Sequence, residues 1–257
     1  MCELFGVSSP EKIYLNDLLK EFFSHGTEHP NGWGMAFFYG DAVSLEKQPE
    51  ASFKSAYLRQ RLRACIEADN MMAHIRLATR GNMDYENTHP FVARDSSGRS
   101  WTFEHNGTIF ECDELNPYVK TQEGHTDSER VLLYIIDRIN EAEREKRSPL
   151  SKSERFGVID RVVCGITPEN KLNFVMYDGE LLYAHTNYKG SLYVSEKGKA
   201  AVISTRPLDL GRWEPLPLDT LVAYEHGQLT YTGTDHGNEF FDSEEKMRLL
   251  FLDFAGL

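Results

Sequence analysis

The sequence predicts an α+β protein in which two sheets are flanked by helices. Segments with strand character outnumber helical segments, and the two kinds are interleaved along the chain. Several neighbouring strands have the spacing of antiparallel hairpins rather than of parallel strands joined by a crossover helix. The chain has 257 residues, enough to bury a sizeable core. Because no repeat or linker divides it, we expect one domain over residues 1–257.

The first half of the chain is expected to alternate short strands with two helices. The strands cover residues 2–8, 34–39, 71–76 and 101–104. One helix covers about 14–24, where Leu15, Leu18 and Phe22 recur at helical spacing. The other covers about 53–68. Each strand is followed by a polar segment that contains Gly or Asn, so loops are expected at the strand ends.

The second half is expected to begin with a helix over about 127–145, which follows the capping-box pattern Thr126-x-x-Glu129. Another helix is expected near 151–164. A hairpin then joins strands 172–177 and 181–185 across Asp178-Gly179, a pair suited to a type I′ turn. Further strands are expected near residues 192–194, 200–204, 220–224 and 228–232.

Composition excludes several classes of function. Forty acidic and 28 basic residues give a net charge of -12, which disfavours binding to nucleic acid or to an anionic membrane. No apolar run approaches the roughly 18 residues of a membrane span, and a signal-peptide pattern is missing, so we expect a cytoplasmic protein. The four cysteines contain no C-x-x-C pair and the nine histidines lie in separate segments. We therefore expect neither a metal nor a cofactor.

Cys2 has an unusual position. A small residue after the initiator methionine permits removal of Met1, which would leave a thiol and a free α-amine on one residue. Their reference pKa values, near 8.5 and 7.7–8.0, are close enough for a proton to pass between them. Cys2 would then be a nucleophile beside its own base. The alternative is a small residue buried in a strand.

Five segments identify a family when they are taken together. They are Met1-Cys2-Glu3-Leu4-Phe5-Gly6, Asn31-Gly32-Trp33-Gly34, His74-Ile75-Arg76-Leu77-Ala78-Thr79, Glu104-His105-Asn106-Gly107 and Thr126-Asp127-Ser128-Glu129. In this order they resemble class II glutamine amidotransferases of the N-terminal-nucleophile (Ntn) hydrolase superfamily. The resemblance implies a four-layer αββα sandwich of two antiparallel sheets. It also implies that the nucleophile begins a strand between the sheets, within a single glutamine amidotransferase type-2 domain.

The resemblance assigns an oxyanion hole to the Asn-Gly pair. Here its donors would be the side-chain amide of Asn106 and the backbone N–H of Gly107, two neutral groups that can face a developing oxyanion. The residues alone leave another interpretation open, because Asn-Gly is also the strongest signal for a type I′ hairpin turn.

Three further residues resemble the family's glutamyl-binding positions. Arg76 would hold the α-carboxylate of the substrate with its planar guanidinium, and Asp127 would receive the α-ammonium. Thr79 would lie near the same head group. The alternatives are a surface arginine at a strand end, an acid favoured in the first turn of a helix, and an ordinary loop hydroxyl. We assign Trp33 no catalytic role.

The chain departs from the pattern of many family members. Cys-Gly-Ile is replaced by Cys2-Glu3-Leu4, and the arginine motif ends in Arg80 where histidine is common. Family members of the synthase type also carry a second domain that consumes ammonia, for which 257 residues leave no room. We therefore expect a stand-alone glutaminase-type domain.

The expected activity is cleavage of glutamine or another γ-glutamyl amide through a thioester on Cys2, which releases glutamate and ammonia or an amine. The ammonia either passes to a separate protein subunit or is simply released. The alternative is a non-catalytic, glutamyl-binding regulatory subunit of a synthase. Residues 242–257 form an amphipathic segment that is expected to dock on the domain or on a second copy in a homodimer.

Overall fold

The computed structural model describes residues 2–78 and 82–243, which form two antiparallel sheets. The first sheet has seven strands in the order β11-β9-β10-β1-β4-β2-β3. Their bounds are β1 (Glu3–Tyr14), β2 (Trp33–Tyr39), β3 (Ala42–Gln48), β4 (Glu67–Ile75), β9 (Tyr193–Lys197), β10 (Ala200–Ser204) and β11 (Glu214–Pro215). The second sheet has six strands in the order β13-β12-β8-β7-β6-β5. Their bounds are β5 (Phe91–Arg94), β6 (Ser100–His105), β7 (Phe174–Tyr177), β8 (Leu182–His185), β12 (Thr220–Glu225) and β13 (Gln228–Asp235).

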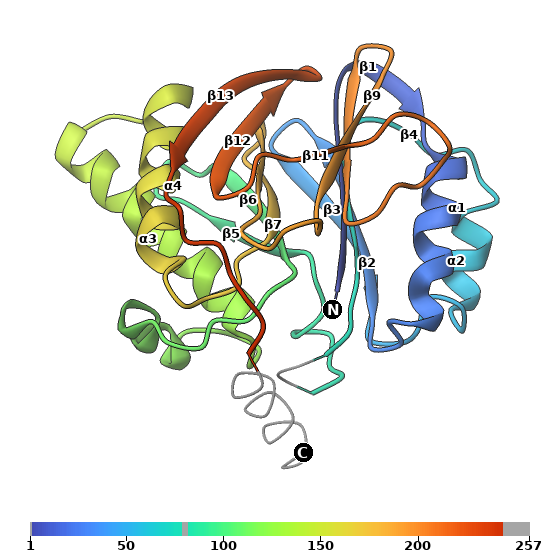
Figure 1. The fold of residues 1–257 in the computed structure, drawn as a ribbon, viewed down its shortest axis with the longest axis horizontal. Coiled ribbons are helices and arrows are strands. Elements are labelled where there is room, and N and C mark those ends of the chain that lie inside the picture. The colour runs from blue at the N-terminus through green and yellow to red at the C-terminus, as the bar shows by residue number, and fades with distance from the viewer. Residues whose placement is uncertain (1, 79–81, 244–257) are drawn as a thin grey trace.

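Helices cover the outer faces of both sheets. α1 (Asn16–Ser24) and α2 (Ala56–Arg61) lie on the first sheet, and α3 (Asp127–Lys146) and α4 (Lys152–Ile166) lie on the second (Figure 1). Two short 3-10 helices, η1 (His25–Thr27) and η2 (Asp113–Lys120), complete the set in the described residues. The four-layer αββα sandwich is thus confirmed. No helix in this part of the chain combines the length and the apolar character that crossing a membrane requires.

Three apolar clusters hold the layers together. One joins α1 and α2 to the first sheet and includes Phe5 and Val7. A second joins α3 and α4 to the second sheet. The third lies between the sheets, where Leu4 packs with Val175 and other residues of the second sheet. Because side chains alternate along a strand, Leu4 facing inward means that Cys2 also faces the space between the sheets.

β1 is a central strand. It pairs with β4 on one side, where Glu3 lies opposite Ile75, and with β10 on the other, where Phe5 lies opposite Ser204. The nucleophile predicted from the sequence therefore begins a strand that has neighbours on both sides.

The second predicted helix is wrong in length. The sequence favoured a helix over about 53–68, but α2 covers only Ala56–Arg61, and residues from Glu67 onward belong to β4. The Ser55 side chain accepts a hydrogen bond from the Leu58 N–H, which fixes where α2 begins. Residues 67–69 are polar or small, so only the pairing of Glu67 and Ala68 with β1 reveals the strand. β3, β5 and the two-residue β11 were also missed.

The hairpin between β7 and β8 forms, but its turn is shifted by one residue. Asp178 donates its N–H to Leu181 O over 3.3 Å, so Gly179 and Glu180 are the central residues. Only Gly179 of these two has a positive φ, at 90°, which is typical of a type II′ rather than a type I′ turn. Asp178 is therefore not a central residue of the turn, and its side chain makes other contacts.

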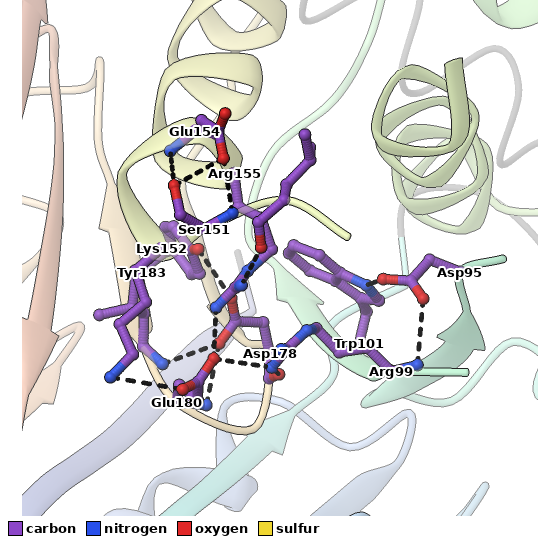
Figure 2. A network of polar contacts seen from close by, with 12 residues as sticks. Asp95, Arg99, Trp101, Ser151, Lys152, Glu154, Arg155, Asp178, Glu180 and Tyr183 are labelled. Atoms are coloured by element: carbon purple, nitrogen blue, oxygen red, sulfur yellow. Dashed lines mark hydrogen bonds and ion pairs between the residues drawn. The ribbon is translucent and has the colours of Figure 1, made fainter. Parts of the chain in front are cut away.

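The side chain of Asp178 is the centre of a buried polar network (Figure 2). Its Oδ2 accepts from Arg155 Nε over 2.7 Å and from the Tyr183 hydroxyl over 2.9 Å, while Oδ1 accepts from two backbone N–H groups of the turn. Arg155 also contacts Glu180 over 2.7 Å. This network joins α4 to the end of the second sheet where β7 and β8 turn.

Candidate active site

The thiol of Cys2 lies on the inner face of the first sheet, next to the segment that follows β4. Its Sγ is within 3.4 Å of both the carbonyl and the N–H of Leu77, donating to the former and accepting from the latter. Burial raises the pKa of the thiol, while the charge of Arg76 lowers it and the charge of Asp127 raises it. The resting side chain is therefore a protonated thiol, within range of both charges.

Arg76 comes directly after β4 and is only 2% exposed. Its N–H donates to Gly32 O over 2.8 Å, and its Nη1 donates to Asn82 O over 2.8 Å. Burial lowers the pKa of the guanidinium, and the negative charges of Asp84 and Asp127 raise it. Arg76 is thus a buried cation at the site, and not the surface arginine that the sequence left open.

The Asn31-Gly32-Trp33-Gly34 segment extends the pairing of β2 with β4 to the site. Asn31 donates its N–H to Arg76 O over 3.0 Å, and its Oδ1 accepts from Ala78 N over 3.0 Å. A Cβ at Gly34 would lie 2.1 Å from His89 O, so only glycine allows this backbone approach. Trp33 points the other way into the helix-side core, where its ring meets Phe23 edge-on at 5.9 Å.

The Asn106-Gly107 pair is not a hairpin turn. Asn106 N–H donates to Asn173 O over 2.8 Å, and Thr108 and Lys171 exchange backbone hydrogen bonds of 3.0 and 3.1 Å. The chain therefore runs straight past residues 171–173 after β6. Neither residue has the positive φ that a type I′ turn requires. A Cβ at Gly107 would lie 2.0 Å from Lys171 O, so the close approach to this loop demands glycine.

The side-chain amide of Asn106 is a donor without an acceptor. Asn106 is 2% exposed, and its Nδ2 has no hydrogen-bond partner within residues 2–78 and 82–243. A buried amide N–H that lacks an acceptor costs about 1–3 kcal/mol, so such groups are rare unless a ligand uses them. The arrangement suits an oxyanion hole.

Asp127 is the first residue of α3 and is 5% exposed. The N-cap is Thr126, whose hydroxyl accepts from Glu129 N over 3.2 Å, so Asp127 is not needed as a cap. Its Oδ2 accepts from Ile109 N over 2.8 Å and its Oδ1 from Ser128 N over 2.9 Å. These bonds hold a buried carboxylate whose charge acts on both Cys2 and Arg76.

The histidines around the site are neutral. Burial lowers the pKa of His74 to about 3 and also lowers the pKa values of His89 and His105. His105 Nε2 lies 3.3 Å from Lys171 O, which can only accept, so Nε2 carries the proton and Nδ1 accepts from the Ser128 hydroxyl. In residues 2–78 and 82–243 no three His, Cys, Asp or Glu side chains are grouped to hold a metal ion.

Two ionisable residues near the site were not assigned a role from the sequence. Lys171 is 5% exposed, and its Nζ lies 3.5 Å from the ring centroid of Tyr188. Burial lowers the pKa of its ammonium to about 8, while the negative charge of Asp242 acts in the opposite direction. Glu104 lies two residues before Asn106 and is fully buried. No local sequence pattern marks Lys171, whereas Glu104 stands out as an ionisable residue within a strand.

One predicted site residue and most of one predicted segment are not described by the structure. Thr79 lies outside the described residues, as do residues 244–257 of the expected C-terminal amphipathic segment. Of that segment, Asp242 is described, and its Oδ2 accepts from the Tyr188 hydroxyl over 2.6 Å.

Comparison with known proteins places the chain in a family. The family model for class-II glutamine amidotransferases matches residues 1–195. An uncharacterized protein of Methanocaldococcus jannaschii is 30% identical over 262 residues, which cover 90% of this chain and 71% of that protein. The Escherichia coli protein named "Putative glutamine amidotransferase YafJ" is 31% identical over 188 residues, covering 72% of each chain.

A solved structure agrees at the level of the fold. The structure of a "predicted glutamine amidotransferase" from Pseudomonas aeruginosa superimposes with a TM-score of 0.63. It covers 90% of this chain and 100% of its own, at 21% identity, which supports the shared sandwich alone. Together with the family match over residues 1–195, these comparisons show that the chain belongs to the class-II glutamine amidotransferase family.

Proposed function

We propose that this chain is an amidohydrolase that cleaves glutamine or another γ-glutamyl amide through a thioester on Cys2. One observation carries the proposal: a thiol at the start of a central strand lies within range of a buried cation, Arg76, and a buried anion, Asp127. A glutamyl group has the complementary charges, an α-carboxylate and an α-ammonium, at a fixed distance from its δ-carbonyl.

Recognition of the head group follows from these two charges. The Arg76 guanidinium binds the α-carboxylate through two parallel hydrogen bonds, and Asp127 receives the α-ammonium. Because both side chains are buried, neither charge is screened by solvent as a surface pair is. In a γ-glutamyl amide the α-ammonium and the α-carboxylate of the glutamyl residue are both free. In an ordinary peptide these groups are part of the peptide bonds, so the site selects γ-linked amides.

The acyl step uses Cys2 and the Asn-Gly pair. After removal of Met1, the Cys2 α-amine accepts the thiol proton while Sγ attacks the δ-carbonyl carbon. The carbonyl oxygen becomes an oxyanion that accepts from Asn106 Nδ2 and the Gly107 N–H. The α-ammonium then protonates the leaving amine as the C–N bond breaks, which leaves a γ-glutamyl thioester.

A general base is needed because burial raises the pKa of the Cys2 thiol and keeps it protonated at rest. The α-amine, with a reference pKa near 7.7–8.0, is matched to this task at neutral pH. In the second step the same amine takes a proton from water, which attacks the thioester. Glutamate leaves and the thiol regains its proton.

The direct test is intact-protein mass before and after incubation with 6-diazo-5-oxo-L-norleucine, a reactive glutamine analogue. We expect loss of Met1 and one adduct, which peptide mapping places on Cys2. Cys2→Ala should abolish both the adduct and turnover of glutamine or γ-glutamyl anilides, while the thermal midpoint stays within about 2 °C. Cys65→Ala is the matched control, since Cys65 is exposed and precedes β4, whereas Arg76 follows the other end of that strand.

Each outcome is informative. A fully active Cys2→Ala protein would contradict the thioester mechanism. Retained Met1 with no adduct, but with thermal stabilisation by glutamine, would instead favour the non-catalytic, glutamyl-binding regulatory subunit. Free ammonia measured alongside glutamate tells simple hydrolysis from transfer to a separate protein.

A further inference from the structure

Glu104 connects the two strands that carry the proposed catalytic groups. Along β6 side chains alternate, so Glu104 shares with Asn106 the face that looks toward the first sheet. Glu104 is 0% exposed, and its Oε1 accepts a hydrogen bond from the backbone N–H of Phe5 over 3.1 Å. A side chain of the second sheet thereby holds the backbone of β1, the strand that Cys2 begins.

The two sheets are in close contact at this point. A Cβ at Gly6 would lie 2.9 Å from Val175 Cγ1, so the backbone of β1 packs directly on a side chain of β7. Val175 is the cross-strand partner of Glu104. Glu104 therefore spans the sheets beside this contact, and the length of its side chain brings an acceptor to the backbone of β1.

The carboxyl group of Glu104 is uncharged. Burial raises its pKa well above the ordinary value, and the Phe5 N–H, which lowers it, is the one opposing influence. An isolated carboxylate in such surroundings is too costly to persist, so the group keeps its proton. Its other oxygen, Oε2, has no partner within the described residues. What the site uses is thus a carbonyl-type acceptor on a long side chain.

We propose that Glu104 is a positioning residue, which fixes the height of the nucleophile strand above the oxyanion strand through the Phe5 N–H. The inference rests on the function proposed above. Phe5 lies three residues from Cys2, about 10 Å along the strand, and Glu104 lies two residues from Asn106, about 7 Å. A displacement of about 1 Å between nucleophile and oxyanion donors can reduce the rate about a hundredfold.

Three substitutions test this role. Glu104→Gln keeps the length and a carbonyl acceptor, Glu104→Asp keeps the acid but is one methylene shorter, and Glu104→Met keeps the length without an acceptor. We expect kcat for a γ-glutamyl anilide to fall about a hundredfold in the Met and Asp variants and to stay within about threefold in Gln. KM should change less than threefold, because Arg76 and Asp127 are untouched. Thr102→Val is the control, since Thr102 shares this buried face but is not bonded to β1.

A purely structural role predicts a different pattern. If Glu104→Gln is as slow as Glu104→Met, or if the Met variant keeps kcat within threefold, the proposal is wrong. Should the Met variant fail to fold, the comparison of Gln with Asp decides in the same way. An unchanged pH dependence of kcat in Glu104→Gln would further exclude proton transfer by Glu104.

Amide exchange separates this inference from the proposed function. Exchange of the Phe5 N–H, followed by NMR, should be at least tenfold faster in Glu104→Met than in wild type and unchanged in Glu104→Gln. If wild type cleaves no γ-glutamyl amide, the proposed function fails. The exchange rate of the Phe5 N–H then still tests whether Glu104 holds the backbone of β1. Equal exchange rates in Glu104→Met and wild type would overturn the positioning role of Glu104.

Discussion

Asn106 gives the sharpest prediction at the scale of one residue. Its buried Nδ2 has no acceptor in the described residues, so Asn106→Ala removes a donor that the folded protein does not otherwise use. We expect kcat to fall by about 10²–10³, as when one oxyanion donor is removed elsewhere, with stability unchanged or slightly increased. Steady-state kinetics and urea unfolding measure the two effects. Loss of stability without loss of rate would assign Asn106 to the fold.

Arg76→Lys tests the geometry of head-group recognition. Lysine keeps the charge but cannot form two parallel hydrogen bonds to a carboxylate. We expect KM for glutamine to rise at least tenfold, with a smaller change in kcat. Arg94→Lys is the control, since Arg94 is exposed at the end of β5. An unchanged KM would mean that Arg76 supports the loop through Asn82 rather than the substrate.

The sequence could name most candidate residues but not how they act together. For Asn106-Gly107 the sequence allowed two interpretations, an oxyanion hole and a type I′ turn. The pairing with the loop at Lys171, which is remote in the chain, decides between them. Glu104 was visible in the pattern, since polar residues 102, 104 and 106 alternate with aromatic ones. Its partner, the Phe5 N–H, is a backbone group of the other sheet, and no local pattern reveals such a contact.

At the scale of elements, the contact between α4 and the β7–β8 turn is testable through Asp178. Arg155 and Asp178 are 2% and 0% exposed, so Asp178→Asn leaves a buried guanidinium without its main counter-charge. We expect the free energy of unfolding to fall by about 3 kcal/mol. Glu141→Gln breaks the exposed pair with Arg138 and should cost less than about 1 kcal/mol.

Labelling of Cys2 provides the second readout for Asp178→Asn. Asp178 lies beyond the Tyr177 end of β7, whereas the site lies beyond the Phe174 end. The folded variant should therefore be labelled by 6-diazo-5-oxo-L-norleucine at the wild-type rate. Slower labelling would show that the network also shapes the site.

Elements were predictable where their local signals agreed with their tertiary contacts. The helix expected over 127–145 is α3, because a capped start and a continuous apolar stripe both specify it. The capping box is only half formed, since Glu129 accepts from Glu123 N and Gly124 N instead of from Thr126. β3 was missed because it lies at a sheet edge, where Val43 and Leu45 are its only large apolar residues and the rest of the strand is small or polar.

At the scale of the whole molecule, buried neutral histidines link stability to pH. Burial lowers the pKa of His185 to about 3, against about 6.5 in the unfolded chain. Its contribution is therefore complete above pH 6.5 and is lost as the pH falls toward 3, by roughly 1.4 kcal/mol per pH unit. Between pH 6.5 and 4.5, the unfolding free energy of His185→Gln should depend less steeply on pH than that of wild type. The difference in slope corresponds to about one proton fewer taken up on unfolding.

Comparison with wild type isolates this effect. Glu104 and Asp219, whose pKa values are raised by burial, act in the opposite direction, but equally in both proteins. His226→Gln is the control, since its side chain is 70% exposed. Parallel pH dependence of wild type and His185→Gln would show that His185 is protonated in the folded protein.

The central place of β1 has a consequence for synthesis of the chain. β1 meets β4 once residue 75 has been made, but its other edge stays open until β10 ends at residue 204. At about 5–20 residues per second, roughly 130 further residues take about 6–26 seconds. During that interval the nascent chain presents an unpaired edge that other chains can join. A ribosome-associated chaperone should therefore matter most for this protein while residues 75–204 are being translated.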